Sequence, residues 1–168
     1  ITDPSAYFQT ALYTGNGGSN TITNDGNSNL QPDWLWIKAR NSVQNHQLHD
    51  SSRGASKGLN SNNNNAEYTD ANAVTGFTSD GFTMNNNYGS HNASGNTYVA
   101  WQWAANGGTT ATNTDGSQNS TVQVNSTAGF SIVKRTGTGS AGATYGHGLG
   151  AVPDVIINKA LNINEWYS

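Results

Sequence analysis

The stretch "YVAWQW", residues 98–103, decides the fold class of this chain. Side chains of an extended chain point alternately to the two faces of a sheet. This alternation places Val99, Trp101 and Trp103 on one face, and Tyr98, Ala100 and Gln102 on the other. A period of two residues, with aromatic and β-branched side chains, predicts a β-strand.

A second stretch, "DWLWIK" at 33–38, repeats this pattern, with Trp34, Trp36 and Lys38 opposite Leu35 and Ile37. The segments "STVQVNS" (120–126) and "FSIVKR" (130–135) alternate in the same way. No window of helical length carries an amphipathic helical stripe, so we expect an all-β chain.

Turn signals separate these short strands. "GFTSDGFTM" places Asp80-Gly81 between two apolar-alternating runs, which is the strongest hairpin signal in the chain. Further Asp-Gly pairs occur at 25–26 and 115–116. Short strands with frequent turns predict an antiparallel β-sandwich, of the jelly-roll or concanavalin-like kind.

The composition narrows the function classes. The chain has 168 residues with a net charge of −3, and 25 of its residues are Asn, so amides and hydroxyls rather than charges keep its surface soluble. The seven basic residues are scattered, which disfavours nucleic-acid binding. No apolar run approaches the roughly 20 residues that would insert into a membrane. Without cysteine there is no disulfide or thiolate chemistry.

The chain also repeats itself. Phe8 and "YTGNG" (13–17) match Phe130 and "RTGTG" (135–139) at a shift of 122, while "PDWLWIKA" (32–39) matches "PDVIINKA" (153–160) at a shift of 121. Residues 106–118 lack large apolar side chains and are typical of a linker. We therefore expect a first β-sandwich unit at 1–105, a Gly/Thr/Asn linker at 106–118, and the incomplete start of a second, homologous β unit at 119–168.

About fifty residues seldom close a sandwich, because a sheet face needs a partner that buries it. We therefore expect the 168 residues to be part of a longer polypeptide, or residues 119–168 to pair with the first unit or with a neighbouring chain.

The motifs in their order resemble a tandem repeat family in marine bacteriophage structural proteins, described as tail-fibre-like or concanavalin-like. The resemblance rests on "DPSAYFQTALYTGNG", "LQPDWLWIKAR", "HDSSRG", "SDGFTM" and "NASGNTYVAWQW", and on the second Thr-Gly-x-Gly and Pro-Asp blocks. It implies a β-sandwich carried on a virion surface rather than an enzyme. It transfers no binding residue to this chain.

Candidates for catalysis and metal binding are weak. Glycoside hydrolases need two carboxyl groups across a cleft, but most of the eight Asp occupy turn sequences and the two Glu, Glu67 and Glu165, lie far apart in the chain. His46 and His49 would share a face only on a helix, whereas their surroundings indicate a strand. We expect no catalytic residue, no metal site and no cofactor.

The aromatic residues are the best candidates for ligand binding, because sugar rings stack on exposed Trp and Tyr. We name Tyr88, which lies in a polar loop beside His91, and then Trp34 and Trp36. Paired Trp at a period of two more often form a core, and we favour that interpretation for all four paired Trp, most strongly for Trp101 and Trp103. Separately, "DSSRG" predicts a structural turn closed by Asp50 and Arg53.

Two function hypotheses remain. The first is a non-enzymatic phage virion surface protein, a tail-fibre or appendage module that adheres to host-surface glycans, has a structural role, or both. Its partners would be other virion subunits, in a homo-oligomer, and a host glycan. The alternative is a secreted carbohydrate-active enzyme or its carbohydrate-binding module.

Overall fold

The computed structural model describes residues 1–167, and their regular structure is almost entirely β-strand. Its elements are η1 (Pro4–Ala6), β1 (Phe8–Thr14), β2 (Ser19–Thr23), β3 (Trp34–Ala39), β4 (Gln47–Asp50), β5 (Lys57–Asn60), β6 (Tyr68–Thr69), β7 (Val74–Thr78), β8 (Gly81–Asn85), β9 (Thr97–Trp103), β10 (Ala111–Asn113), β11 (Ser120–Asn125), β12 (Phe130–Lys134), β13 (Asn158–Lys159) and β14 (Trp166–Tyr167). The strands that form sheets pair antiparallel throughout.

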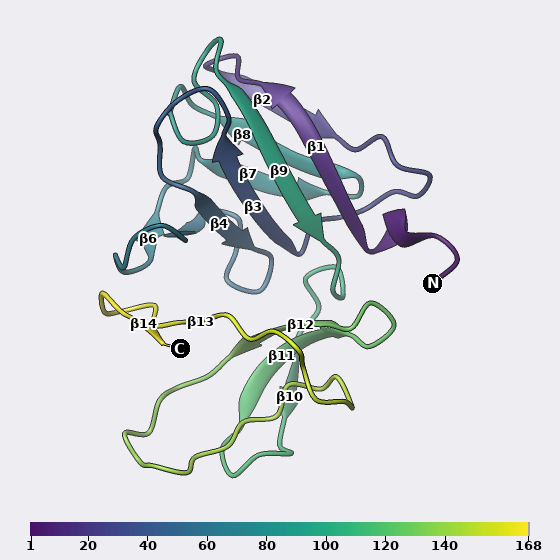
Figure 1. The fold of residues 1–168 in the computed structure, drawn as a ribbon, viewed down its shortest axis with the longest axis vertical. Coiled ribbons are helices and arrows are strands. Elements are labelled where there is room, and N and C mark those ends of the chain that lie inside the picture. The colour runs from purple at the N-terminus through teal and green to yellow at the C-terminus, as the bar shows by residue number, and fades with distance from the viewer. Residues whose placement is uncertain (168) are drawn as a thin grey trace.

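Six strands form the larger sheet, in the order β1-β9-β3-β4-β5-β6. The two stretches with the clearest alternation, β9 and β3, are neighbours near its centre (Figure 1). Their register sets Trp34 opposite Trp103 and Trp36 opposite Trp101. The indole side chains of both strands therefore gather on one face of the sheet.

The smaller sheet has the order β2-β8-β7, and the expected hairpin around Asp80-Gly81 joins β7 to β8. Gly81 has a φ of +123°, and a Cβ at this position would collide with the carbonyl oxygen of Ile22 in β2. Only glycine adopts this conformation without strain, so the hairpin and its contact with β2 both depend on it.

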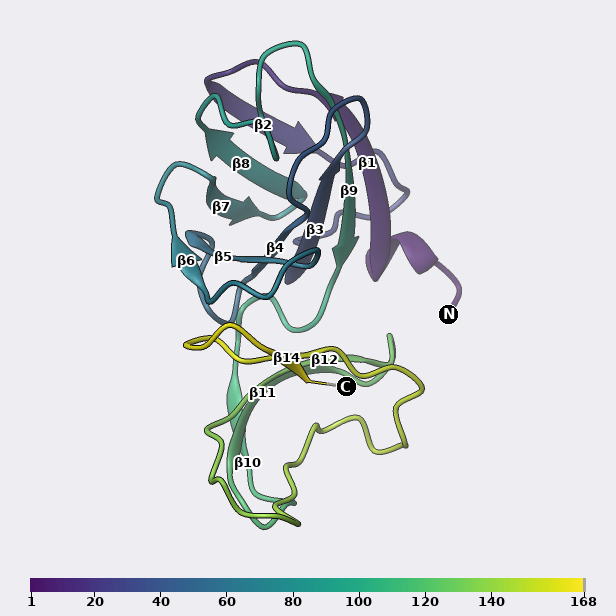
Figure 2. The same cartoon turned by 60° about the vertical axis from the view of Figure 1, so that its left-hand side comes forward.

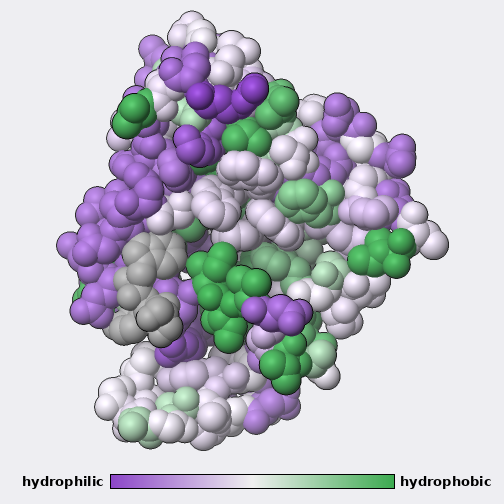
Figure 3. Space-filling model, in the orientation of Figure 1, coloured by the Kyte–Doolittle hydropathy of each residue, from purple (hydrophilic) through white to green (hydrophobic). Residues whose placement is uncertain are grey.

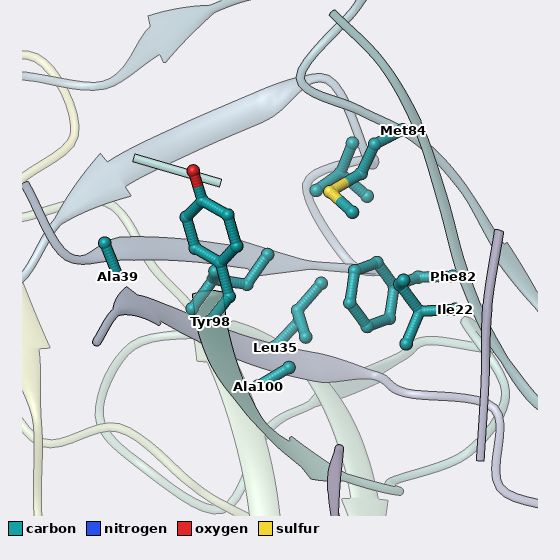
Figure 4. Packing of buried hydrophobic residues seen from close by; sticks show 9 residues of the cluster. Ile22, Leu35, Ala39, Phe82, Met84, Tyr98 and Ala100 are labelled. Carbon is teal, nitrogen blue, oxygen red and sulfur yellow. The ribbon is translucent and has the colours of Figure 1, made fainter. Parts of the chain in front are cut away.

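The two sheets stack face to face as a sandwich (Figure 2). Their inner faces supply the buried cluster of Ile22, Leu35, Ile37, Ala39, Val74, Phe82, Met84, Tyr98 and Ala100. Figure 4 shows Phe82 and Met84 of one sheet facing Leu35 of the other. The Tyr98 hydroxyl donates to the carbonyl of Gly89, 2.8 Å away, and accepts from the N–H of Ala93, so the ring is buried with its polar end satisfied. The expectation of an all-β antiparallel sandwich is confirmed.

The chain beyond β9 forms a separate, smaller sheet, β10-β11-β12, and the short pair β13-β14, which lie below the sandwich in Figure 1. β10 lies inside residues 106–118, so the expectation of a linker there is wrong for Ala111–Asn113. The reason is main-chain pairing: β11 supplies a partner, and the small polar side chains of β10 do not prevent the ladder from forming. That residues 119–168 begin a second homologous unit stays a prediction; Ser168 lies outside the described residues.

The C-terminal segment contacts the sandwich at several places. The ring of Phe130 in β12 stacks on Trp34, with ring centroids 5.9 Å apart. The N–H of Glu67 donates to the carbonyl of Leu161, and that of Ala66 donates to Asn164 Oδ1. In residues 1–167, no helix has the length and apolarity needed to cross a bilayer.

Candidate functional site: the outer tryptophan face

Four tryptophans lie on the outer face of the six-stranded sheet, turned away from the smaller sheet. They come in two directly opposed pairs, Trp34 with Trp103 and Trp36 with Trp101, with ring centroids 4.7 Å and 5.7 Å apart. Each is half-buried, whereas the intervening residues of β3 and β9 are fully buried. We call this surface the outer tryptophan face.

The interpretation of these tryptophans as core residues is therefore wrong. Alternation separates two faces of a strand, but it does not say which face is turned inward. The inner layer here is filled by Leu35, Ile37 and Ala39 of β3 and by Tyr98 and Ala100 of β9. Packed sheets lie only about 10 Å apart. Small and medium side chains from the larger sheet fit that gap against Phe82 and Met84, and the large indoles lie outside.

A shallow depression of about 470 Å³ occupies part of this face. Its lining consists of three of the tryptophans and two basic side chains, namely Trp36, Lys38, His46, Trp101 and Trp103. The lining surface is thus almost wholly apolar and contains no carboxylate. Trp34 does not line the depression; it packs beneath Phe130.

The basic groups are held at the rim by the sheet. The Lys38 Nζ donates to the carbonyl of Ala39 at 3.0 Å, which leaves its other protons for a ligand or water. Burial, and secondarily the positive charge of Lys38, lower the pKa of His46 below its ordinary value of 6.5. At neutral pH His46 can therefore donate or accept a hydrogen bond as the neutral ring.

Tyr88 and His91 lie in the loop between β8 and β9. Their rings are 5.5 Å apart, but Tyr88 is 56 % exposed whereas His91 is only 1 % exposed. Burial lowers the pKa of His91 to about 4. Tyr88 can therefore contact a surface ligand directly, whereas His91 cannot. Neither residue lines the depression on the outer tryptophan face.

Asp50 and Arg53 form the ion pair at the turn after β4. The Arg53 backbone N–H donates to Asp50 Oδ1 at 2.8 Å, and its Nε donates to Asp50 Oδ2. Gly54 follows with a φ of +102° and donates to the carbonyl of Asp50. The sequence did not indicate a third partner, Glu67, whose Oε2 accepts from Arg53 Nη1 at 2.9 Å. These groups are nearly buried and paired, so their role is structural.

The two histidines of "HQLHD" lie on opposite sides of the sheet, as a strand requires. His46 lines the outer depression, whereas His49 is buried beside Tyr68. Within residues 1–167, no three or more His, Cys, Asp or Glu side chains come together in a way that could hold a metal ion.

A second depression, of about 440 Å³, lies between β1 and β2, which are edge strands of the two sheets. Its lining residues with polar side chains are Thr10, Tyr13, Thr21, Thr23 and Asp25. Asp25 is the one carboxylate among the residues lining the two depressions. A carboxylate pair of the kind that glycoside hydrolysis requires is therefore found in neither of them.

A comparison with protein families gives one match. The family described as "Domain of unknown function (DUF7483)" matches residues 3–167. The chain belongs to this family. The match extends over the sandwich and the C-terminal sheet together. Searches of curated proteins and of solved structures gave no match.

Membership of this family assigns no activity to the chain. The sequence analysis named Trp34 and Trp36 as binding candidates, and it favoured a core role most strongly for Trp101 and Trp103. Strand pairing was the signal that could have linked Trp101 and Trp103 to Trp34 and Trp36. Two paired antiparallel strands with the same alternation present their large residues on the same face of the sheet. Lys38 and His46 gave no comparable signal, because single basic residues are common on any surface.

Asp33, one residue before β3, is the most heavily bonded carboxylate of the structure's described part. It is fully buried and accepts four hydrogen bonds, from Ser51 Oγ at 2.6 Å and from the N–H groups of Ala105, Gly107 and Gly108 at 2.6–2.9 Å. It binds the backbone just after β9 rather than a ligand. The recurrence of Pro-Asp at 153–154 was the one sequence signal that marked it.

Proposed function

We propose that this chain is a non-enzymatic module of a phage virion surface protein, in a tail fibre or similar appendage, that adheres to host-surface glycans through the depression on the outer tryptophan face. One observation carries the proposal: three half-buried tryptophans, Lys38 and His46 line a shallow, open depression on a rigid sheet. Sites on sheets hold their geometry better than sites on loops.

The chemistry of the depression suits a sugar ring. The axial C–H faces of a pyranose are apolar and pack on indole rings, while its hydroxyl groups need donors and acceptors at the rim. Lys38 offers a charged donor and His46 offers a ring nitrogen. Because the lining has no acidic side chain, a neutral or anionic saccharide fits it better than a cation does.

The placement on a virion rests on the resemblance of the sequence motifs and on the surface composition. A surface rich in Asn, Ser and Thr with only 10 % charged residues is common in viral fibres and extracellular β proteins. A single shallow site binds weakly, so we further propose a homo-oligomer with other virion subunits as neighbours. Several copies acting together turn weak contacts into useful avidity.

The alternative is a secreted carbohydrate-active enzyme or its binding module. The outer tryptophan face would serve a binding module equally well. For an enzyme, the two depressions offer a single carboxylate, Asp25, and the carboxylates of Asp33, Asp50 and Glu67 are committed to hydrogen bonds or ion pairs. This distribution favours binding over catalysis.

A glycan array and a host-cell adhesion assay, both with the isolated chain, test the proposal. We expect Trp36→Ala and Trp101→Ala each to weaken binding about tenfold, since each removes one stacking surface. Trp34→Ala is the matched control: it has the same residue type on the same face but lies outside the depression. Thermal unfolding checks that all variants are folded.

Three outcomes would overturn the proposed site or role. Binding that is lost with Tyr88→Ala and kept with Trp101→Ala moves the site to the loop between β8 and β9. Equal loss with Trp34→Ala and Trp101→Ala means that general destabilisation explains the result. If the chain binds no host surface and contacts only neighbouring virion subunits, its role is architectural.

A further inference from the structure

The depression on the outer tryptophan face has a lysine without an acidic partner at one end. Lys38 lies in β3 two residues after Trp36, and both side chains line the depression. Two residues of a strand span about 6.5 Å, so the ammonium group and the indole ring start from main-chain positions that far apart. Among residues 1–167, ion pairs are formed by Arg53 and Lys57, and none by Lys38.

The carboxylates of these two strands lie at the opposite end. Asp33 precedes β3, and Asp50 ends β4 directly opposite Trp34, which comes four residues before Lys38. Both carboxylates are already engaged in hydrogen bonds or an ion pair within the protein. Arg40 follows β3 at the Lys38 end; it is exposed, and no ion pair of the described residues involves it. Positive charge therefore gathers at the Lys38 end of the depression.

His46 places an uncharged polar group beside this charge. Its backbone N–H donates to Asn62 Oδ1 at 2.9 Å, and its carbonyl accepts from the N–H of Ser61 at 2.9 Å, so its main chain is held in place. Its ring lines the depression and makes no hydrogen bond within the part of the chain that the structure describes. A neutral imidazole has one N–H donor, and an ammonium group has three. Lys38 and His46 together therefore offer donors to both oxygens of one carboxylate.

The surroundings of the depression suit the rest of a sugar. Figure 3 looks onto the outer face of the six-stranded sheet, because that sheet lies in front of the smaller one in Figure 1. Residues of intermediate hydropathy occupy the middle of the sandwich in this view, and hydrophilic residues border it on the left and upper sides. Hydroxyl groups that extend beyond the indoles would therefore meet polar surface.

We propose that the depression selects saccharides that carry a carboxylate, such as hexuronic acids, with the apolar face of the sugar on Trp36 and Trp101 and the carboxylate at Lys38 and His46. This inference rests on the proposed glycan-binding function and names the class of glycan. A neutral sugar uses the indoles but not the charge. A phosphate group is matched best by the planar fork of arginine, and the lining of the depression contains none. A singly charged carboxylate matches one lysine.

Titrations of the tryptophan fluorescence of the full chain test this selection. The probes are trisaccharides of galacturonate, guluronate and mannuronate, each compared with its own methyl ester, which keeps the sugar and removes the charge. Titration up to about 10 mM saccharide detects millimolar binding. We expect at least one acid to bind about tenfold or more tightly than its ester. Raising the salt concentration to about 1 M should reduce this difference, because salt screens an exposed ion pair.

Four variants separate charge from stacking. Lys38→Gln removes the charge and should reduce the affinity for the acid to that for its ester, whereas Lys38→Arg should keep most of the preference. Trp101→Ala removes a stacking surface and should weaken acid and ester alike, about tenfold. Lys134→Gln is the matched control. It removes an exposed lysine of β12 that lies outside the depression, and it should leave both affinities unchanged.

The inference is overturned, and the proposed function is kept, if every ester binds as tightly as its acid while Trp101→Ala weakens both. It is also overturned if Lys38→Gln and Lys134→Gln reduce the preference equally, because net charge then explains it. A sulfated neutral trisaccharide that binds more tightly than every acid would rule out the choice of carboxylate. If none of these saccharides binds, the glycan array separates the two claims. Binding there to neutral glycans alone overturns the inference, and binding to no glycan overturns the proposed function as well.

Discussion

Asp33 and Gln123 accept hydrogen bonds from the same backbone amide. The N–H of Gly108 lies 2.9 Å from Asp33 Oδ1 and 2.8 Å from Gln123 Oε1. Asp33 directly precedes β3 of the sandwich, and Gln123 belongs to β11 of the C-terminal sheet. Gln123 Nε2 also donates to Ser51 and Ser52 in the sandwich. The two parts of the chain are thus joined by a buried polar network instead of a free linker.

Asp33→Asn will lower the free energy of unfolding by about 2–4 kcal/mol, because an amide group places an N–H₂ against backbone donors that now face a carboxylate oxygen. Asp154→Asn is the matched control. Asp154 is the Asp of the second Pro-Asp pair and is exposed, so its substitution will lower the free energy of unfolding by less than about 0.5 kcal/mol. Urea denaturation measures both, and similar costs for the two would contradict the role assigned to Asp33.

Gln123→Ala will loosen the joint without unfolding the sandwich. It removes the acceptor for Asn106 and Gly108 and the donor to Ser51 and Ser52. We expect a protease to cleave residues 106–118 of this variant faster than those of the wild type. Mass spectrometry of the fragments measures the cleavage rate. Gln118→Ala, at an exposed position in the same segment, will leave the cleavage rate unchanged. Equal cleavage of wild type and Gln123→Ala would show that the network does not restrain this segment.

Arg53→Met will destabilise the chain by about 3–5 kcal/mol, since it leaves the nearly buried carboxylate of Asp50 without its cation and takes from Glu67 the nearer of its two cations. Lys57→Met is the comparison. The Lys57 Nζ lies 3.7 Å from Glu67 and its side chain is far more exposed, so its loss will cost about 0–1 kcal/mol. Thermal and chemical unfolding of both variants give the difference, and the prediction fails if Lys57→Met costs as much as Arg53→Met.

The stability of the chain will fall as the solution is made acidic. Burial lowers the pKa of His49 to about 3 and that of His91 to about 4, against an ordinary 6.5. Below pH 6.5 the unfolded chain takes up protons that the folded chain does not, so the folded state loses stability as the pH falls toward 3. Each histidine will account for about 2.5 kcal/mol between pH 7.5 and 4.5.

The measurement is chemical denaturation at these two pH values. His49→Gln and His91→Gln should each reduce the difference between the two pH values by about that amount. A pH dependence equal to that of wild type in both variants would rule out the buried histidines as its source.

Gly81→Ala will lower the free energy of unfolding by more than an ordinary glycine substitution does. The new Cβ meets the Ile22 backbone at a φ of +123°, so we expect a loss of more than about 2 kcal/mol. Gly129→Ala is the control, because Gly129 has a φ of +68° with open space around it, and about 1 kcal/mol is expected there. Equal costs, measured by thermal unfolding, would mean that the contact with Ile22 relaxes easily.

Much of the fold follows from local patterns. Alternation in "YVAWQW" and "DWLWIK" predicts β9 and β3, and Asp80-Gly81 predicts the β7-β8 hairpin, because main-chain geometry and turn chemistry are local properties. The pair of Asp50 and Arg53 belongs to the same class, since its partners are three residues apart. The third partner, Glu67, is brought in by sheet pairing and has no local signature.

Local patterns do not decide which face of β3 and β9 is turned toward the core. Both faces of β3 and β9 are apolar, so either could have been turned inward. The choice depends on the smaller sheet, whose Phe82 and Met84 leave room for Leu35 and Ala100 but not for indoles. Long-range packing also decided which binding candidates a ligand can reach. It buried His91 and left Trp101 and Trp103 accessible.

The residue pattern along the chain therefore accounts for an all-β sandwich, its hairpin, its turn pair and its internal repeat. Long-range packing accounts for the outer tryptophan face and for the polar joint at Asp33 and Gln123. The physical reason is that secondary structure depends on neighbours within a few residues. Burial depends on which distant strands come to cover each face, and that choice is made only when the sheets assemble.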